Sequence, residues 1–195
     1  MDLLYRCYYT TFITMFDKSL YWLTPIVVIA SATACFSVQY LTLEQAQRAC
    51  FPTATQWIAT PVELTRDQMA LIEKDSGIPV RFHEQKVWAA YHGSAFLGWV
   101  ILDSVLGKHE AIQWVLALEK EGSIRQIEIL EYKETFGSEI RQKKWQSQFF
   151  GKKHGAKLKL NQDIQNISGA TLSSRHVTQG VKRLLSFYEL ILKPH

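Results

Sequence analysis

Residues 86–106, KVWAAYHGSAFLGWVILDSVL, decide the fold of this chain. Both halves of this stretch are rich in aromatic and β-branched residues, and the turn residues Gly93-Ser94 separate them, which is the pattern of two strands joined by a hairpin. The pattern repeats in residues 110–120 and 123–132, with a turn at Glu121-Gly122. Consecutive hairpins predict an antiparallel sheet.

Helical patterns stand on both sides of the predicted strands. Before them, Thr42-x-x-Gln45 and Thr65-x-x-Gln68 are capping-box signatures that begin two short helices. After them, residues 138–151 place apolar side chains at near-helical spacing, and an apolar stripe over residues 172–192 predicts a longer helix. Helices that flank a sheet of hairpins predict the α+β fold class.

The first 38 residues differ from a globular domain. Residues 20–38 carry no charge and follow a weakly positive stretch, as in a secretory signal with a cleavage site at Ala32-x-Ala34. The same residues are long enough to span a bilayer if they stay uncleaved, although Pro25 interrupts them. Cys35 leaves lipoprotein processing as a third alternative. Each alternative predicts an exported domain, either periplasmic or membrane-anchored and facing the periplasm.

The length and composition exclude several classes of protein. The 195 residues suffice for one domain with an extension, and we expect a signal or anchor at 1–38, a helical lead-in at 39–84 and the main domain at 85–195. A net charge of +4 is far below that of a nucleic-acid-binding protein, so no nucleic acid is expected. After residue 38 only Cys50 remains, and no Cys/His cluster has zinc spacing, so we expect neither an internal disulfide nor a metal site.

The segment SGATLSS, residues 168–174, precedes the last predicted helix and holds more hydroxyls than one helix cap requires. Thr171 stands at the start of that helix, where free backbone N–H groups and the helix dipole attract phosphate. Gly169 permits a close approach of the backbone. The residues alone leave two interpretations, which are a threonine that carries a phosphate group and an ordinary capped helix after a glycine turn.

Three segments together resemble a known family. NISGATLSS, residues 166–174, resembles the attachment motif S/T-G-A-T/S-x-S/T of the FMN-binding domain family. YKETFG is similar to the family's E-T-x-G element, with all three defining residues present: Glu134, Thr135 and Gly137. Residues 145–152 resemble its aromatic-Gly-Lys stretch. The family includes the C subunit of sodium-pumping NADH:quinone reductases, the G subunit of Rnf complexes and the periplasmic flavin domain of the nitrous-oxide-reductase regulator.

The resemblance implies that FMN is the cofactor and that its phosphate is esterified to Thr171. The remaining cofactor-binding residues that it implies are Ser168, Gly169, Ala170, Leu172, Ser173, Glu134, Thr135 and Gly137. In the family a dedicated flavin transferase attaches FMN from FAD with a divalent metal. A threonine hydroxyl is a weak nucleophile and no partner base is evident beside it, so we expect the same partner here.

One position departs from the family pattern. The family has an aspartate six residues before the acceptor, where this chain has Gln165, and Asp163 lies two residues further upstream. This departure bears on covalent attachment more than on flavin binding.

A basic stretch lies between the sheet and the SGATLSS segment. Residues 139–160 contain one acid, Glu139, and seven basic side chains: Arg141, Lys143, Lys144, Lys152, Lys153, Lys157 and Lys159. They form either a solvated face or a surface that steers an acidic redox partner.

The sequence thus predicts an exported FMN-binding flavoprotein that relays electrons. The flavin supplies the redox chemistry and the polypeptide supplies position and electrostatics, so no catalytic side chain is expected. A carrier or a subunit of a redox complex, with a partner that could be membrane-embedded, is favoured over a stand-alone enzyme. Two alternatives stay open, which are a redox-sensing or assembly module of a membrane complex and a basic binding module without flavin.

Overall fold

The computed structural model describes residues 38–134 and 137–193. Almost all of the predicted signal or anchor segment falls on residues 1–37 and Thr135 falls on residues 135–136, so both lie outside the described residues. Within the described ranges, no helix is both long and apolar enough to cross a membrane.

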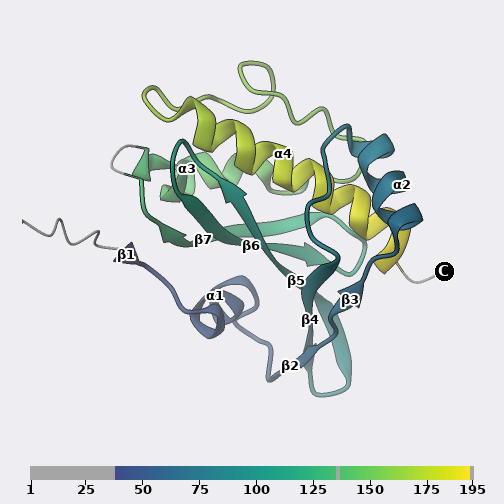
Figure 1. Ribbon diagram of the computed structural model, residues 1–195. Coiled ribbons are helices and arrows are strands. Elements are labelled where there is room, and N and C mark those ends of the chain that lie inside the picture. Colours follow the sequence, from purple (N-terminus) through teal and green to yellow (C-terminus); the bar gives the residue numbers. More distant parts are fainter. Residues whose placement is uncertain (1–37, 135–136, 194–195) are drawn as a thin grey trace, which may run out of the picture. The chain divides into compact units, whose positions relative to one another are not determined.

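A seven-stranded antiparallel sheet forms the centre of the fold (Figure 1). Both predicted hairpins are present, because β4 pairs with β5 and β6 pairs with β7. The strand order is β1-β7-β6-β5-β4-β2, and β3 also pairs with β4. The strands are β1 Val38–Gln39, β2 Gln56–Ala59, β3 Val62–Glu63, β4 Glu84–His92, β5 Ala95–Leu106, β6 Ala111–Glu119 and β7 Ile124–Tyr132. The predicted antiparallel sheet is therefore confirmed.

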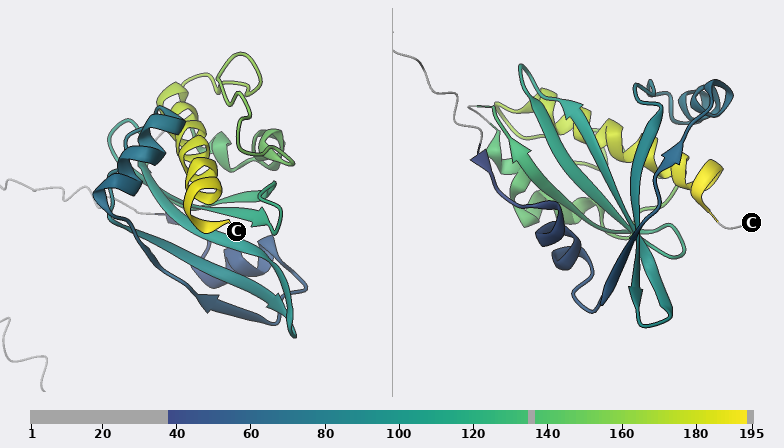
Figure 2. Two further views of the ribbon diagram at one scale, coloured as in Figure 1. Left: turned by 90° about the vertical axis from the view of Figure 1, so that its right-hand side faces the viewer. Right: turned by 60° about the horizontal axis from the view of Figure 1, so that its bottom comes forward.

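Helices cover both faces of this sheet (Figure 2). Successive side chains of a strand point to opposite faces. In β5, Ile101 belongs to the cluster that α4, Thr171–Phe187, and α2, Arg66–Ser76, cover. Its neighbour Val100 belongs to the cluster under α1, Leu43–Cys50. The α+β arrangement of an antiparallel sheet flanked by helices is therefore confirmed.

The two short helices begin where their capping boxes predict. The side-chain oxygen of Thr42 accepts a hydrogen bond from the Gln45 N–H at 3.2 Å, and the Gln45 side chain accepts one from the Thr42 N–H at 2.8 Å. Thr65 and Gln68 form the same pair at the start of α2. These contacts join residues three apart, so the local sequence alone specifies both helix starts.

Residues 138–151 differ from the helical segment that their spacing predicted. They form three short turns: the 3₁₀ turns η1, Ser138–Arg141, and η2, Ser147–Phe149, with the helical turn α3, Lys143–Gln146, between them. Ile140, Trp145 and Phe149 are all buried. Because they are five and four residues apart, one straight helix would not place all three on the same face.

A buried ion pair and a glycine contact fix α4 on the sheet. Arg183 of α4 donates to both carboxylate oxygens of Asp103 on β5, at 2.7 and 2.6 Å. Nearly one turn earlier, a Cβ at Gly180 would lie 2.7 Å from the ring of Trp114, so the helix backbone rests on that ring. The helix continues as a π-helical turn, Tyr188–Leu192, and the predicted long helix is confirmed. Its register on the sheet sets where its N-terminus lies.

Candidate functional site

A cavity of about 450 Å³ lies where the β5–β6 turn, the end of β7 and the start of α4 meet. Its lining residues are Lys108, His109, Glu134, Gly169, Ala170, Thr171, Leu172 and Ser173. The cavity therefore brings together residues from two motifs that are far apart in the sequence, the E-T-x-G element and the SGATLSS segment.

The N-terminus of α4 has no side-chain cap. Ala170 is the N-cap residue, no side chain bonds to the cap position, and the first turn contains no acidic residue. The hydroxyl of Ser174 instead donates to the Ala170 carbonyl at 2.9 Å, and that of Ser173 is 3.2 Å from the Tyr132 hydroxyl. The interpretation of SGATLSS as an ordinary side-chain cap is therefore wrong. The uncapped end leaves backbone donors and the positive end of the helix dipole facing the cavity.

Thr171 lies at the first position of α4 with its side chain half-buried. Its Oγ1 accepts a hydrogen bond from the Asn166 side-chain amide at 3.0 Å. The other end of that amide, Oδ1, accepts from the Ile167 N–H at 2.9 Å. The hydroxyl that the sequence predicts as the flavin acceptor is thus on the cavity wall and held by one partner.

Glu134 braces the β5–β6 turn. Its Oε1 accepts from the His109 N–H at 2.5 Å and from the Glu110 N–H at 3.0 Å. A Cβ at Gly107 would lie 2.6 Å from the same oxygen, so only glycine allows this approach without a shift. Burial raises the pKa of the Glu134 carboxyl, but hydrogen bonds from the backbone of Glu110, His109 and Lys108 outweigh it and hold the pKa below its ordinary value. Glu134 therefore stays a carboxylate that shapes one wall of the cavity.

Gly137 packs against Ala170 of the SGATLSS segment. A Cβ at this position would lie 2.2 Å from the Ala170 Cβ and 2.5 Å from the Tyr132 hydroxyl, and its φ of 94° is in the left-handed region. Gly137 therefore contacts the SGATLSS segment without lining the cavity. Ser168 is exposed and also does not line it.

Three residues near the cavity were not predicted from the sequence. Lys108 and His109 lie in the short connection between the two hairpins, where strand patterns end and assign no role. The sequence feature that could have pointed to Lys108 and His109 is the short run Gly107-Lys108-His109, in which a glycine precedes two side chains that can carry positive charge. Asn166 belongs to the segment that resembles the family motif but has no role in that motif, and its contact with Thr171 depends on the folded loop.

Gln165 stands where the family has an aspartate, and both polar groups of its backbone form hydrogen bonds. The Gln165 N–H donates to the Gln148 side chain at 2.7 Å, and the Gln165 carbonyl accepts from the Trp145 ring N–H at 2.8 Å. Asp163 uses its carboxylate within its own loop, where it accepts from the Leu158 and Lys159 N–H groups at 3.0 and 2.7 Å. Asp163 therefore does not take the place of the missing aspartate at Thr171.

Some side chains of the basic stretch contact other residues of the fold, and others form no ion pair with the described residues. Three of its members contact other residues of the fold: Lys143 pairs with Glu128, Lys152 with Asp163, and Arg141 lies over the ring of Tyr40. The other four are exposed and form no ion pair within residues 38–134 and 137–193: Lys144, Lys153, Lys157 and Lys159.

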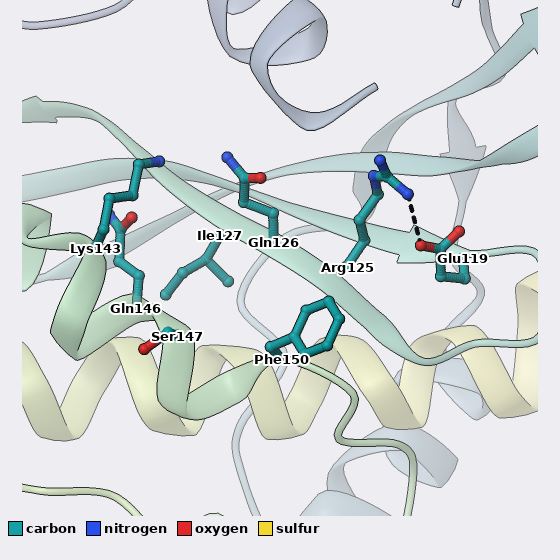
Figure 3. A pocket seen from close by; sticks show the side chains of 8 residues that line it. All are labelled: Glu119, Arg125, Gln126, Ile127, Lys143, Gln146, Ser147 and Phe150. Atoms are coloured by element: carbon teal, nitrogen blue, oxygen red, sulfur yellow. Dashed lines mark hydrogen bonds and ion pairs between the residues drawn. The ribbon is translucent and has the colours of Figure 1, made fainter. Parts of the chain in front are cut away.

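A second cavity, of about 480 Å³, lies near the other end of β7 (Figure 3). Arg125 pairs with Glu119 at 2.8 Å on one side of it, and Gln146 and Phe150 come from α3 and the residue after η2. None of the predicted site residues lines this cavity. Among the described residues, no group of three His, Cys, Asp or Glu side chains could hold a metal ion.

Comparison with known proteins places the first cavity inside a family domain. Residues 107–186 match the family described as FMN-binding domain, and this range contains every residue that lines the cavity. The chain is 29% identical over 143 residues to the G subunit of the proton-translocating ferredoxin:NAD(+) oxidoreductase complex of Clostridium ljungdahlii, and the match covers 66% of this chain and 77% of the relative. The crystal structure of Shewanella oneidensis NqrC has the same fold, with a TM-score of 0.50 at 18% identity over 73% of this chain and 84% of that one.

The residues of the cavity fit FMN. A volume of about 450 Å³ lies in the range of small-molecule sites. The uncapped start of α4 offers backbone donors to a phosphate, and Leu172, 39% exposed, offers apolar surface to a ring. The match of residues 107–186, the relatives and this fit agree with the motifs found in the sequence. Residues 107–186 therefore form an FMN-binding domain, and FMN is the cofactor to which this match points.

Proposed function

We propose that this chain is an exported flavoprotein that relays electrons, with FMN held by a phosphoester on Thr171. The observation that carries the proposal is the cavity in which Thr171, at the uncapped start of α4, meets the turn that Glu134 braces. An ester at Thr171 would place the phosphate beside free backbone N–H groups, which stabilise an anion at a helix N-terminus. Lys108 and His109 line the same cavity and would add positive charge or hydrogen-bond donors near this group.

The electron-relay role rests on the cofactor and on the relatives. A flavin accepts and donates one or two electrons, whereas the protein sets its position and its electrostatic surroundings. The relative from Clostridium ljungdahlii is named as a component of an oxidoreductase complex. By analogy, the partner of this chain is a redox protein, which could be membrane-embedded. The four free lysines would favour an acidic surface on that partner.

A covalent link agrees with the predicted location. Residues 1–38 act in this proposal as a signal peptide or a membrane anchor, and the domain lies outside the cytoplasm. Loosely bound FMN that dissociates there is lost, whereas a tether keeps the local concentration of cofactor high regardless of affinity. A flavin transferase is the partner that would form the link, because a threonine hydroxyl is a weak nucleophile and the side chain bonded to it, Asn166, is an amide and not a base.

Intact mass and in-gel fluorescence of the denatured protein test the attachment. The full chain and Thr171→Ala are each co-expressed with a flavin transferase, and Ser94→Ala serves as the control because Ser94 is an exposed hydroxyl outside the motif. We expect wild type and Ser94→Ala to be fluorescent and heavier by one FMN less water. Thr171→Ala should show neither signal. Covalent flavin in Thr171→Ala would refute the assignment of the acceptor.

The rate of electron exchange separates the relay from the sensing alternative. A relay should re-oxidise rapidly with a soluble electron acceptor and bind its partner transiently. Slow exchange together with a stable complex with a membrane protein would favour the redox-sensing or assembly role instead.

A further inference from the structure

The side-chain amide of Asn166 is fixed in one orientation by its own loop. Its Oδ1 accepts from the Ile167 N–H at 2.9 Å, so its Nδ2 is the atom that lies 3.0 Å from Thr171 Oγ1. An amide NH₂ group only donates, so Oγ1 accepts this hydrogen bond with one lone pair. The hydroxyl proton of Thr171 and its second lone pair therefore point away from Asn166.

The loop that presents Asn166 is tied to the core. The residue before it, Gln165, is held on both sides of its backbone by Gln148 and Trp145, at 2.7 and 2.8 Å. Trp145 is 5% exposed and belongs to the core cluster that α4 also covers. The loop that carries Asn166 and the helix α4 that carries Thr171 thus both pack on the same core cluster. This restricts the relative motion of the donor and the acceptor.

We propose that Asn166 is a positioning residue for covalent attachment of the flavin, and this inference rests on the proposed ester at Thr171. In the attachment step, Oγ1 attacks the phosphorus of the FMN half of FAD. The bond between this phosphorus and the bridging oxygen breaks, AMP leaves with that oxygen, and the hydroxyl proton passes to a base of the transferase. Asn166 holds Thr171 Oγ1 in one orientation and leaves the second lone pair and the proton of that hydroxyl available. After the ester has formed, Asn166 Nδ2 can still donate a hydrogen bond to the same oxygen.

Two substitutions separate this role from a contribution to the loop structure. Asn166→Ala removes both hydrogen bonds of the side chain. Asn166→Asp keeps an oxygen for the Ile167 N–H but has no N–H to donate to Thr171. Gln162→Ala is the matched control, because Gln162 is an exposed side chain of the same loop without a side-chain hydrogen bond in the described part of the chain.

The experiment follows covalent labelling of the purified full chain by a flavin transferase with FAD and Mg²⁺. Intact mass gives the initial rate at several concentrations of the acceptor protein, hence kcat and KM. We expect kcat to fall about tenfold or more in both Asn166 variants, because a misplaced nucleophile loses the benefit of orientation. KM and the unfolding temperature should stay close to the wild-type values, and Gln162→Ala should label like wild type.

The possible results lead to different conclusions. If either Asn166 variant labels within twofold of wild type, or if Asn166→Asp labels faster, a donor at this position is not required and the role of Asn166 is refuted while the ester at Thr171 stands. If only KM and the unfolding temperature change, the side chain supports the loop and does not position the hydroxyl. If wild type takes no covalent flavin, or Thr171→Ala does, the proposed attachment itself fails and the inference fails with it.

Discussion

The carboxylate of Glu134 acts on the cavity through the main chain. It accepts hydrogen bonds from two consecutive backbone N–H groups of the β5–β6 turn, His109 and Glu110. Hydrogen bonds to a charged acceptor are stronger than those to a neutral one. The E-T-x-G element therefore contributes a brace that fixes Lys108 and His109 at the edge of the cavity.

Replacement of Glu134 should weaken this brace in a pH-dependent way. We expect Glu134→Gln to lower the free energy of unfolding by about 1 kcal/mol near neutral pH, because an amide oxygen is a weaker acceptor and the site is half-exposed. The pKa of Glu134 is lowered in the folded state, so its stabilisation is complete above the unfolded pKa of about 4.3 and is lost as the pH falls through the folded pKa.

Urea unfolding followed by tryptophan fluorescence over this acid range measures the effect. The difference between the unfolding free energies of wild type and Glu134→Gln should shrink as the pH falls. A difference that stays constant down to the acid end would mean that the charge of Glu134 does not stabilise the turn.

Cys50 is the second residue whose surroundings make a prediction. It is fully buried at the end of α1, and burial raises the pKa of its thiol to about 12. Because the thiolate is the reactive form, Cys50 should resist iodoacetamide in the native protein and react after unfolding. Peptide mass spectrometry distinguishes it from the other cysteines of the chain. Alkylation of native Cys50 at the rate of an exposed thiol would show that α1 opens.

At the scale of elements, α4 is the part that holds the two halves of the site together. Its first residues form the wall with Thr171, and its later turns carry Arg183, whose ion pair with Asp103 is buried against β5. His176, on the turn between them, contacts the carbonyl of Leu106 at the end of β5. These contacts set the distance between the start of α4 and the turn at Lys108.

Removal of one partner of the ion pair should destabilise the whole domain. We expect Arg183→Met to lower the free energy of unfolding by about 3–5 kcal/mol, because it leaves the Asp103 carboxylate buried without a counter-charge. The double variant Asp103→Leu with Arg183→Met should recover much of the loss, since two apolar side chains leave no charge unpaired. Chemical denaturation of the single and double variants measures both effects. A double variant as unstable as Arg183→Met would contradict this explanation.

At the scale of the whole molecule, unpaired positive charge is concentrated in one segment of the chain. The net charge is +4, and four exposed lysines of the segment between η1 and α4 form no ion pair in the described part of the chain: Lys144, Lys153, Lys157 and Lys159. Such a field attracts anionic partners and raises their association rate, and salt screens it.

Electron exchange with small ionic oxidants tests this field. We expect replacement of the four lysines by glutamate to slow re-oxidation of the reduced, FMN-loaded protein by ferricyanide about tenfold at low ionic strength. The rate with a cationic oxidant should change in the opposite direction, and both differences should disappear near 1 M salt. Lys74→Glu, an exposed lysine of α2, is the control. Equal rates for wild type and variant would show that these lysines do not act on the flavin.

Features that depend on neighbouring residues were predictable from the sequence. The capping boxes at Thr42 and Thr65, the two hairpins and the long C-terminal helix all follow from contacts or periodicities that span a few residues. The flavin family was recognisable because the SGAT and E-T-x-G motifs are short and contiguous. Interactions between residues close in the sequence are sufficient to predict these features.

Only the tertiary structure decided which of these residues meet. Glu134 reaches the cavity wall because β7 ends beside the β5–β6 turn, and Thr171 faces it because an ion pair between residues 80 positions apart fixes α4. The division of residues 138–151 into three turns and the contact of Asn166 with Thr171 likewise depend on packing against the core. Such contacts depend on how segments distant in the sequence pack together, and a local sequence pattern contains no information about that packing.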